Sequence, residues 1–505
     1  NATAGTLVLV HKRTRRPTRL VGAAAGLLLA LAYALPADLT FRQLLARGDQ
    51  EVLYHREDGR GVVEVVEDAS SGVRSLLANR LRREGADAPD DIFIARQQGY
   101  LPLLLHPAPH RLAVVGLGTG ASLAASLLDR VATVTVIEIS PGVIEAARLF
   151  ARSSRAVLSA PKVRLVQADG GRFFRTDRQT YDVIVQDLFF PYRAGTGSLY
   201  TLEHYTRLRQ RLAPKGLVVQ WLSLNQLTPR AFQVIARTFQ HVFPHTSLWL
   251  VGGYGALVGS ESAHPIDFAT LQQAYARALA QHPELSRTSP VDFLTAFVCG
   301  PDRLADWTAG APFNTEDNGW IEYRSPLPFD QLYTENELAV ASLSQLLDYR
   351  QPPPVTNLDP RARRRLERAY QARSLALAGL TLLHQGHTTA AHEHYRRAYR
   401  LNPKDAFAAH HMRDTWLASA ADLVEQGRYR EAQDMVFRVL SLSPGSLAGR
   451  FVLAQTLLAE DQPQRALAEF QTIAGRAPAY PGLQDALRSA RQLSRRTDAG
   501  QEDRS

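Results

Sequence analysis

Residues 111–120 read RLAVVGLGTG, an apolar run followed by glycines at positions 116, 118 and 120. A run of this length is typical of a buried parallel strand, and glycines directly after it let the backbone approach a ligand closely. Residues 121–129 are then predicted to form a helix whose N-terminus faces that ligand. Taken alone, the same pattern also fits a tight strand-to-helix turn.

A second predicted strand covers residues 133–139 and ends close to Glu138. This places a carboxylate about 20 residues beyond the glycine loop, where it can hydrogen-bond the two hydroxyls of a ribose. Ser140 and Pro141 fit the cap and the first turn of the following helix. The two strands together therefore predict a nucleoside site.

Two further predicted strands also end in acidic residues. The third leads into Asp169 and Gly170, and the fourth ends in Asp187. Because ligands of doubly wound sheets bind at the carboxyl edge of the strands, we expect Glu138, Asp169 and Asp187 to line one site. The loop carries no Lys or Arg for a pyrophosphate, which favours a nucleoside without phosphates over a nicotinamide cofactor. The alternative is that each acid only caps the helix after its strand.

The order of these motifs resembles the catalytic domain of polyamine aminopropyltransferases, the spermidine synthase family, from about residue 91 to residue 260. The matching segments are LLLHP at 103–107, VIEI at 136–139, ADG at 168–170, YDVIVQD at 181–187 and LYTLEHY at 199–205. The resemblance implies an α/β fold with a Rossmann-like, methyltransferase-type doubly wound sheet. It also implies decarboxylated S-adenosylmethionine as the donor, an amine as the acceptor and Asp187 as the proton acceptor.

The expected site follows from these motifs. The loop glycines shape the nucleoside site, Glu138 binds the ribose, and Asp169 with Gly170 holds the adenine end. Tyr200 and Gln220 are further candidates for substrate contacts. No metal and no permanently bound cofactor are expected. The loop glycines are Gly116, Gly118 and Gly120.

A carboxylate at position 187 suits the implied chemistry. Aminopropyl transfer is the attack of a neutral amine on the carbon next to a sulfonium, and a free alkylamine is almost wholly protonated at neutral pH. A carboxylate close to the amine can accept the proton and hold the nucleophile in line. We therefore expect Asp187 to be the general base.

Three positions depart from the family pattern. Thr119 and Phe190 stand where the family carries aspartates, and Arg96 falls where it carries a glutamate. We expect Arg96 to place a positive charge in the acceptor pocket, where a di- or triamine needs anions, because burying an unpaired ammonium is costly. The resemblance therefore leaves the amine acceptor unidentified.

Two other functions remain open. Methyl transfer from intact S-adenosylmethionine would use the same Glu138 and Asp169, and Thr119 could admit the carboxylate of that donor. The chain could instead be a catalytically degraded nucleoside-binding scaffold whose working part is its helical C-terminus. The presence of Asp187 counts against the scaffold.

Composition limits the remaining classes. The formal charge is +9 over 505 residues, but the basic residues are scattered arginines without a nucleic-acid motif, so no nucleic-acid partner is expected. Cys299 is the single cysteine, which excludes a disulfide framework and a thiolate metal site. No metal ligand geometry is predicted for the clustered histidines, which are His384, His387, His392, His394, His410 and His411.

The N-terminus predicts a membrane segment. Residues 20–35 are an uncharged apolar run that follows a basic stretch at 11–19. The run is shorter than the roughly 20 residues that a span needs, and a cleaved signal peptide is the alternative. We expect the end of a larger bacterial inner-membrane region, with the chain as a fragment and the catalytic domain on the cytoplasmic side, although counting positive charges favours the opposite side.

The chain repeats beyond a proline run at 352–354. Matched positions lie 34 residues apart in the second and third units, and the first step is seven residues longer because of an insertion near 406–412. This period resembles tetratricopeptide repeats, whose paired helices present a surface to a protein or peptide, or stabilise a homo-oligomer. The matched residues are Gly386, Ala391 and Pro403, then Gly427, Ala432 and Pro444, then Asp461, Ala466 and Pro478.

Six segments are therefore expected. They are a membrane segment, a small β region, a catalytic domain, a helical extension, a linker and all-α repeats, over residues 1–40, 41–110, 111–262, 263–350, 351–370 and 371–495. Within the extension, residues 314–317 are expected to form a solvated turn. Trp221 is expected either near the site or in the core.

Overall fold

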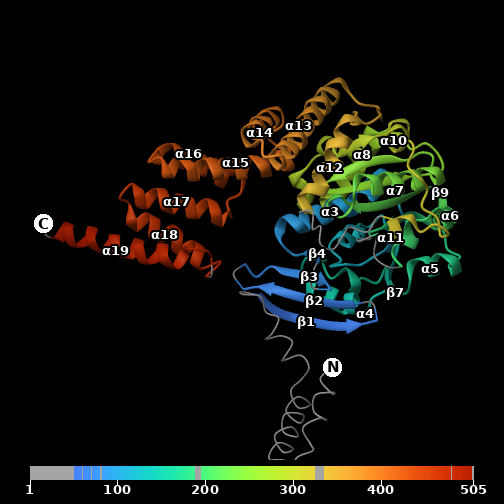
Figure 1. The fold of residues 1–505 in the computed structure, drawn as a ribbon, viewed down its shortest axis with the longest axis horizontal. Helices are drawn as coiled ribbons and strands as arrows, with labels where there is room; N and C mark the ends of the chain where they lie inside the picture. The colour runs from blue at the N-terminus through green and yellow to red at the C-terminus, as the bar shows by residue number, and fades with distance from the viewer. Residues whose placement is uncertain are drawn as a thin grey trace, which may run out of the picture.

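The computed structural model describes residues 50–502 apart from 60, 70, 80–81, 188–190, 192–194, 325–334 and 479. A small sheet, a large α/β unit and a helical arm follow one another along this part of the chain (Figure 1). The predicted membrane segment, residues 1–40, lies outside the described residues. Among the described helices, none is both long enough and apolar enough to cross a bilayer.

The small sheet contains four antiparallel strands in chain order. They are β1 (Gln50–Asp58), β2 (Gly61–Asp68), β3 (Arg74–Ala78) and β4 (Arg82–Ala86). Val63 and Val65 of β2 and Leu76 of β3 are buried in the same core cluster as the α/β unit. Apolar residues on one face therefore fix this sheet against the α/β unit, as expected for a half-buried antiparallel sheet.

The large sheet has eight strands in the order β13-β10-β11-β9-β8-β5-β6-β7. The five strands from β9 to β7 in this order are parallel, and β11, β10 and β13 extend the sheet antiparallel. The strand order reverses between β5 and β8, the place where doubly wound sheets bind ligands. The strands are β5 (Arg111–Val115), β6 (Thr133–Glu138), β7 (Val163–Gln167), β8 (Tyr181–Gln186), β9 (Leu212–Ser223), β10 (Ser247–Val251), β11 (Tyr254–Gly259) and β13 (Phe297–Cys299).

Helices cover both faces of this sheet. They are α3 (Pro89–Leu105), α4 (Pro141–Ala146), α5 (Gly170–Thr176), α6 (Leu202–Arg209), α7 (Pro229–Val242), α8 (Phe268–Gln281), α9 (Pro290–Leu294), α10 (Pro301–Thr308), α11 (Trp320–Arg324) and α12 (Glu335–Asp348). Short 3-10 helices join them: η1 (Ser122–Leu127), η2 (Ala147–Phe150), η3 (Val157–Ser159), η4 (Gly197–Tyr200), η5 (Leu224–Gln226) and η6 (Pro283–Arg287).

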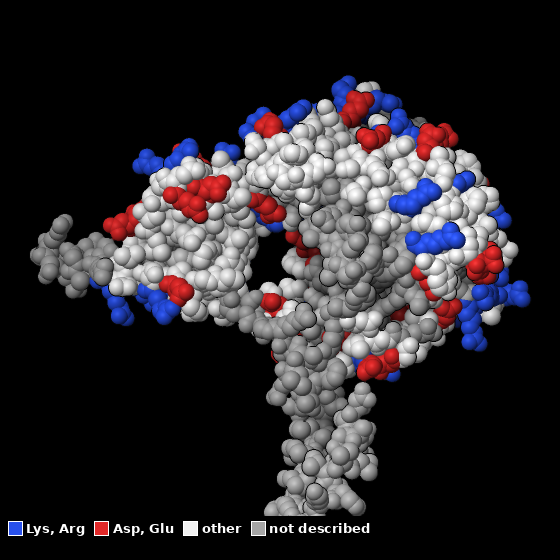
Figure 2. All heavy atoms as spheres, in the orientation of Figure 1, with Lys and Arg blue, Asp and Glu red and all other residues white. Residues whose placement is uncertain are grey.

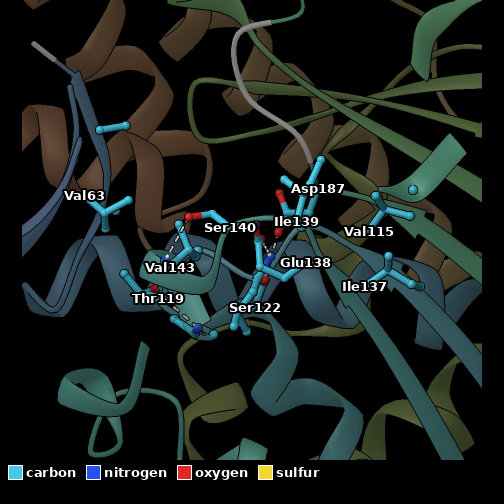
Figure 3. A pocket seen from close by; sticks show the side chains of 18 of the residues that line it. Val63, Val115, Thr119, Ser122, Ile137, Glu138, Ile139, Ser140, Val143 and Asp187 are labelled. Carbon is cyan, nitrogen blue, oxygen red and sulfur yellow. Dashed lines mark hydrogen bonds between the residues drawn. The ribbon is translucent and has the colours of Figure 1, made fainter. Parts of the chain in front are cut away.

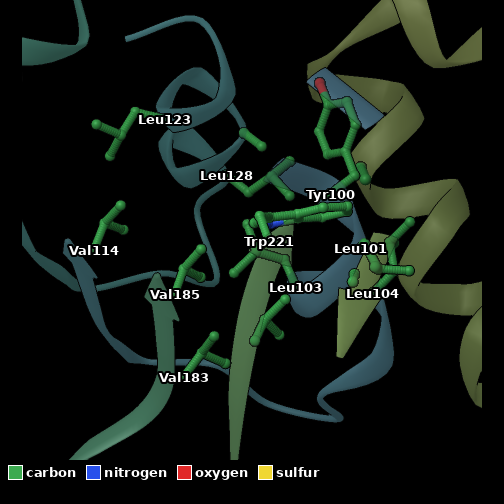
Figure 4. Close-up of a cluster of buried hydrophobic side chains, with 14 of the residues drawn as sticks. Tyr100, Leu101, Leu103, Leu104, Val114, Leu123, Leu128, Val183, Val185 and Trp221 are labelled. Atoms are coloured by element: carbon green, nitrogen blue, oxygen red, sulfur yellow. The ribbon is translucent and has the colours of Figure 1, made fainter. Parts of the chain in front are cut away.

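The strands separate two cores. Leu112 and Val114 of β5 belong to one buried cluster, whereas Ala113 and Val115 belong to the other, because successive side chains of a strand point to opposite faces. Figure 4 shows the first cluster, where the Trp221 ring lies among side chains of α3 and of neighbouring strands. Trp221 is 1% exposed, so it is a core residue.

The helix predicted at 121–129 is present as a 3-10 helix, η1, over Ser122–Leu127. One segment differs from the sequence prediction. The expected helical extension also contains β13, which pairs with β10 at the edge of the main sheet. A three-residue strand is too short to show a hydrophobic period. Two further short strands, β12 (Ile266–Asp267) and β14 (Val355–Thr356), pair in parallel.

The arm is a series of helical hairpins. Its helices are α13 (Pro360–His384), α14 (Thr388–Leu401), α15 (Ala406–Glu425), α16 (Tyr429–Leu442), α17 (Leu447–Ala459), α18 (Pro463–Ala474) and α19 (Leu483–Glu502). The hairpin turns contain Gly386, Gly427 and Asp461, all with positive φ (82°, 73° and 60°). These matched residues therefore mark the same left-handed turn in each unit.

The seven-residue irregularity of the repeat has a structural cause. Helix α15 has 20 residues, whereas α17, its counterpart in the next unit, has 13. The additional residues therefore extend a helix by about two turns instead of forming a loop. The matched alanines are fully buried against neighbouring helices: Ala391, Ala432 and Ala466.

Helix α13 belongs to both parts of the molecule. Its first half contributes Ala362, Leu366 and Ala369 to the core of the α/β unit, and its second half contributes Ala376 to the first hairpin of the arm. The expected linker, residues 351–370, is therefore helical from Pro360 onward.

Candidate functional site

Backbone hydrogen bonds place the predicted acidic residues along one edge. The amide of Asp187 donates to the carbonyl of Val115 (2.9 Å), and the amide of Ala168 donates to the carbonyl of Glu138 (3.0 Å). Strands β8, β5, β6 and β7 therefore end at the same level. Glu138 is the last residue of β6, and Asp169 and Asp187 follow the ends of β7 and β8, so the three acids lie on both sides of the point where the strand order reverses.

A cavity of about 310 Å³ opens at this edge (Figure 3). Seven of the nine site residues predicted from the sequence line it, together with Thr119. Tyr200 and Gln220 do not line it. The seven are Gly116, Gly118, Gly120, Glu138, Asp169, Gly170 and Asp187.

The glycine loop needs its glycines. Gly116, Gly118 and Gly120 have φ values of 97°, 51° and 75°, in the left-handed region that residues with a Cβ rarely adopt. The amide of Leu117 in this loop donates to Oε2 of Glu138 (3.0 Å). The positive φ angles of the glycines and the hydrogen bond to Glu138 therefore hold the loop in an open conformation.

Both carboxylate oxygens of Glu138 accept hydrogen bonds from backbone amides. Besides the bond from the loop, Oε1 accepts from the amide of Ser140 at 2.8 Å. Burial raises the pKa of Glu138, and these backbone donors oppose the increase. Each carboxylate oxygen can accept a second hydrogen bond, so two ribose hydroxyls can still be held.

Asp169 serves as both a cap and a cavity residue. Its Oδ1 accepts from the amide of Arg172 (2.8 Å) and caps α5, which was the alternative interpretation of this residue. The side chain nevertheless lines the cavity. The neighbouring Gly170 has no room for a side chain, because an added Cβ would lie 2.8 Å from a methyl group of Val115. Only glycine therefore allows the first turn of α5 to pack this closely on β5.

Asp187 has one bonded and one unbonded oxygen. Oδ2 accepts from the hydroxyl of Ser122 (2.9 Å), whereas the buried Oδ1 has no hydrogen-bond partner among the described residues. Burial raises the pKa of Asp187 to about 6, and the Ser122 hydroxyl acts in the opposite direction. A carboxylate with this pKa is ionised at neutral pH and is basic enough to take a proton.

Gln98 and Ser122 are site residues that the sequence analysis missed. Gln98 is 5% exposed, and its Nε2 has no partner among the residues described. It lines the cavity together with Asp91 and Ala95 of the same helix. The spacing of these three residues puts them on one face of α3, a signal that the sequence did contain.

Arg96 does not enter the cavity, which corrects the expectation of a positive charge there. Its guanidinium is buried, donates to Glu284 (3.0 Å) and to the carbonyl of Ser153 (2.5 Å), and is absent from the cavity lining. Successive helical residues point about 100° apart, so Ala95 faces the cavity and Arg96 faces Glu284.

Gln220 belongs to a buried polar network behind the cavity, so its expected substrate contact is not supported. Gln186 donates to Gln220 (2.8 Å) and bonds to Nε2 of His204 (2.8 Å). Burial lowers the pKa of His204 to about 3, so its ring is neutral. Tyr200 is also fully buried, and burial together with nearby Asp187 raises the pKa of its phenol.

The expected solvated turn at 314–317 is wrong for Asn314. This residue is fully buried, donates to the carbonyl of Gly197 (3.2 Å) and accepts from the amide of Ile321 (3.1 Å). It therefore braces the segment that supplies Thr196 and Leu199 to the cavity. Phe190, one of the three departures from the family pattern, lies outside the described residues.

Thr119 stands where the family carries an aspartate, and it makes an apolar contact. Its methyl group packs on Gly85, where an added Cβ would come within 2.9 Å of it.

No group of three or more metal-ligating side chains occurs in the part of the chain that the structure describes, the histidines of the arm included. Figure 2 shows basic and acidic side chains interspersed on the face in view.

The chain is similar to known protein families and to individual proteins. A family model described as the spermine/spermidine synthase domain matches residues 96–252, and one described as tetratricopeptide repeat matches residues 423–490. The chain is 30% identical to polyamine aminopropyltransferase 2 of Hyperthermus butylicus over 46% of this chain and 71% of that protein. It is 31% identical to polyamine aminopropyltransferase 1 of Streptomyces coelicolor over 48% of this chain, and spans 47% of that relative. A crystal structure of spermidine synthase from Thermotoga maritima aligns with 52% of this chain and 88% of its own, at 21% identity and a TM-score of 0.42.

Proposed function

The chain belongs to the polyamine aminopropyltransferase family, and from this premise we propose that it transfers an aminopropyl group from decarboxylated S-adenosylmethionine to an amine. The observation that carries the proposal is the unpartnered Oδ1 of Asp187, buried in the cavity beside the glycine loop. A buried carboxylate oxygen without a partner is costly unless a ligand supplies a donor.

The donor would lie along the strand ends. Asp169 and Gly170 face its adenine, Glu138 accepts from its ribose hydroxyls, and the glycine loop lets its sulfonium approach Asp187. Positive charge on the sulfonium is favourable near a carboxylate in a site of low dielectric. The cavity volume of about 310 Å³ falls in the range of small-molecule sites.

The reaction requires one proton transfer. The neutral amine attacks the aminopropyl carbon, a C–N bond forms, the C–S bond breaks, and methylthioadenosine leaves with the electron pair. The amine nitrogen then loses a proton, which Oδ1 of Asp187 accepts. Because Ser122 occupies only Oδ2, the free oxygen remains available for this step.

The acceptor is an amine that needs few anionic contacts. The described cavity lining contains four acids, and three of them are assigned to the donor and the proton transfer. Ile94, Ala95 and Gln98 form the rest of the α3 wall. This wall suits a monoamine or a short diamine with an apolar chain better than a long polyamine with several ammonium groups.

A second candidate rests on Thr119. Without an acid at this position, no described residue of the loop attracts the ammonium of an aminopropyl tail, so the carboxylate of intact S-adenosylmethionine would meet less repulsion. Methyl transfer from the intact donor is therefore the alternative reaction.

We also propose a cellular location for the chain and a class of binding partner for the arm. We expect residues 20–35 to attach the chain to the bacterial inner membrane, with the catalytic domain on the cytoplasmic side. We expect the arm to bind a protein or peptide, because stacked helical hairpins expose an extended surface. Protease digestion of intact spheroplasts would cleave the catalytic domain only if it faces outward.

Product analysis tests the reaction. The full chain would be incubated with decarboxylated or intact S-adenosylmethionine and a panel of amines, and mass spectrometry would detect methylthioadenosine, S-adenosylhomocysteine and alkylated amines. Methylthioadenosine formation that is lost in Asp187→Asn and kept in Asp302→Asn, an exposed acid on α10, supports the proposal. Formation of S-adenosylhomocysteine alone would establish the alternative.

A further inference from the structure

A second and larger cavity lies between the α/β unit and the arm. Its volume is about 530 Å³, and its walls come from α3, the end of β10, α9, α13 and α15. Space-filling spheres show open space between the arm and the α/β unit (Figure 2). Apolar side chains from both parts of the molecule line the cavity: Phe93, Leu101, Leu250, Phe293 and Phe407.

The walls of this cavity are fixed rather than loosely apposed. Asn402 in the arm donates to Asp292 in α9 (3.0 Å), and Arg373 pairs with the fully buried Asp405 (2.7 Å). The ring of His411 stacks on Tyr395 with an interplanar angle of 9°. The cavity is therefore a built feature of the junction, as is common for ligand sites between domains.

Basic residues outnumber acids in the lining of the cavity. Its lining carries four Arg or Lys residues and two acids. One of the acids, Asp292, already accepts from Ser289 (2.6 Å) and Asn402. Among the described basic residues of the lining, Arg373 pairs with the fully buried Asp405, and Arg413 donates to Asp414 at 3.0 Å. The basic lining residues are Arg287, Arg373, Lys404 and Arg413.

The second acid, Asp90, stands among three positive or titratable groups. Arg287 and Arg413 each lie 3.9 Å from its carboxylate, and His410 lies 3.8 Å away. These distances exceed those of hydrogen bonds, so Asp90 engages the three groups only loosely. Arg413 and His410 also pair with Asp414, at 3.0 and 3.5 Å. An additional anion would find donors of opposite charge at this rim.

We propose that this cavity binds an organic anion with an apolar body, such as an aromatic or alkyl carboxylate or sulfonate. The apolar walls would take the body, and Lys404, Arg287 and Arg413 would take the charged group. A polyamine is disfavoured here because the basic groups outnumber the acids. The proposal does not depend on the reaction at the other cavity.

The site would act on the catalytic cavity through a shared wall. Ile94 of α3 lines both cavities. A Cβ on Gly252, which lines the second cavity, would lie 3.1 Å from Ile94, and Tyr254 of the same hairpin lines the catalytic cavity. A bound anion would therefore contact the two elements that form the acceptor side of the site.

The test uses the fluorescent probe 8-anilinonaphthalene-1-sulfonate and the full chain. We expect saturable binding to one site, at least tenfold weaker binding in the pair Lys404→Glu with Arg413→Glu, and unchanged binding in Arg438→Glu, an exposed arginine on α16 outside the cavity. Filling the space with Ala409→Trp should abolish saturable binding. Hydrogen exchange within residues 89–105 should slow on saturation.

Three outcomes would overturn the proposal. They are the absence of saturable binding to the wild type, equal weakening by the rim pair and by Arg438→Glu, and binding that leaves exchange in residues 89–105 unchanged. If Ala409→Trp fails to fold, the rim pair still decides, because Lys404 is exposed and its substitution leaves the apolar walls intact.

Discussion

The hydroxyl of Ser122 donates to Oδ2 of Asp187 at 2.9 Å, while Oδ1 of the same carboxylate is buried without a partner among the described residues. The serine therefore fixes the plane of the carboxylate and leaves one oxygen for the substrate. It also stabilises the ionised form, which burial disfavours. The two residues come from η1 and from the end of β8, on either side of the point where the strand order reverses.

Replacement of Ser122 by Ala should move the pH dependence of turnover. The pKa of Asp187 is about 6, so activity should rise as the pH increases through 6 and the carboxylate ionises. Without the hydroxyl this rise should occur roughly one pH unit higher. Ser126→Ala is the matched control, since Ser126 lies in the same 3-10 helix but donates to the carbonyl of Leu123. An unchanged profile in Ser122→Ala would contradict the assigned role.

Replacement of Asp187 by Asn should stabilise the protein above pH 6. The folded state raises the pKa of this acid from 3.8 to about 6, so the folded state binds the proton more tightly than the unfolded state. Stability is therefore lost as the pH rises from about 4 to 6, by up to about 3 kcal/mol. Thermal melting should show a gain for Asp187→Asn at pH 8 and little change at pH 4. A variant less stable than wild type at pH 8 would be inconsistent with the raised pKa.

Replacement of Glu138 by Gln should weaken nucleoside binding. An amide cannot accept from both Leu117 and Ser140 and also from a ribose, so one backbone donor or one hydroxyl loses its partner. The loss of a bond to a charged group predicts about ten- to hundredfold weaker binding of methylthioadenosine by calorimetry. Glu57→Gln, an exposed acid on β1, should bind like the wild type. Equal affinities in the two variants would refute the ribose assignment.

Replacement of Gln98 by Leu should separate stability from function. The buried Nε2 has no described partner, so an apolar side chain of similar size should raise the free energy of unfolding by about 1 kcal/mol. The same change should raise the KM for the amine, because a polar group of the acceptor wall is lost. Gln273→Leu, on the exposed side of α8, controls for a general effect of leucine. Loss of stability in Gln98→Leu would show that the amide is already satisfied.

Replacement of Leu366 by Ala should destabilise the α/β unit and the arm together. Leu366 is 5% exposed and belongs to the core of the α/β unit, although it lies on the first helix of the arm. We expect a loss of about 2–5 kcal/mol in one cooperative transition. Leu453 is also buried, within the arm, and Leu453→Ala should affect the helical signal more than the fluorescence of the tryptophans in the α/β unit. Two separate transitions in Leu366→Ala would contradict a shared core.

The sequence was most informative where a backbone pattern determines position. The strand ends that carry Glu138, Asp169 and Asp187 were predictable because parallel strands end at one edge of a sheet. The repeat turns were predictable because each needs a residue that tolerates positive φ. Both features depend on short stretches of neighbouring residues, which a sequence displays directly.

The sequence was least informative where long-range contacts decide the direction of a side chain. Arg96 was expected in the acceptor pocket, and its pairing with Glu284, 188 residues later in the chain, turns it away. Asn314 was expected in solvent, whereas bonds to Gly197 and Ile321 bury it. Strand β13 depends on an edge that β10 provides. None of these partners is visible from local spacing.

Helix α13 limits how the α/β unit and the repeats can be separated during evolution. Because one uninterrupted helix supplies packing to both, a gene fragment ending in the proline run at 352–354 would encode a sheet that lacks part of its own core. The two parts can therefore be recombined with other proteins only by cutting through a helix. Selection on the stability of either part acts on the other.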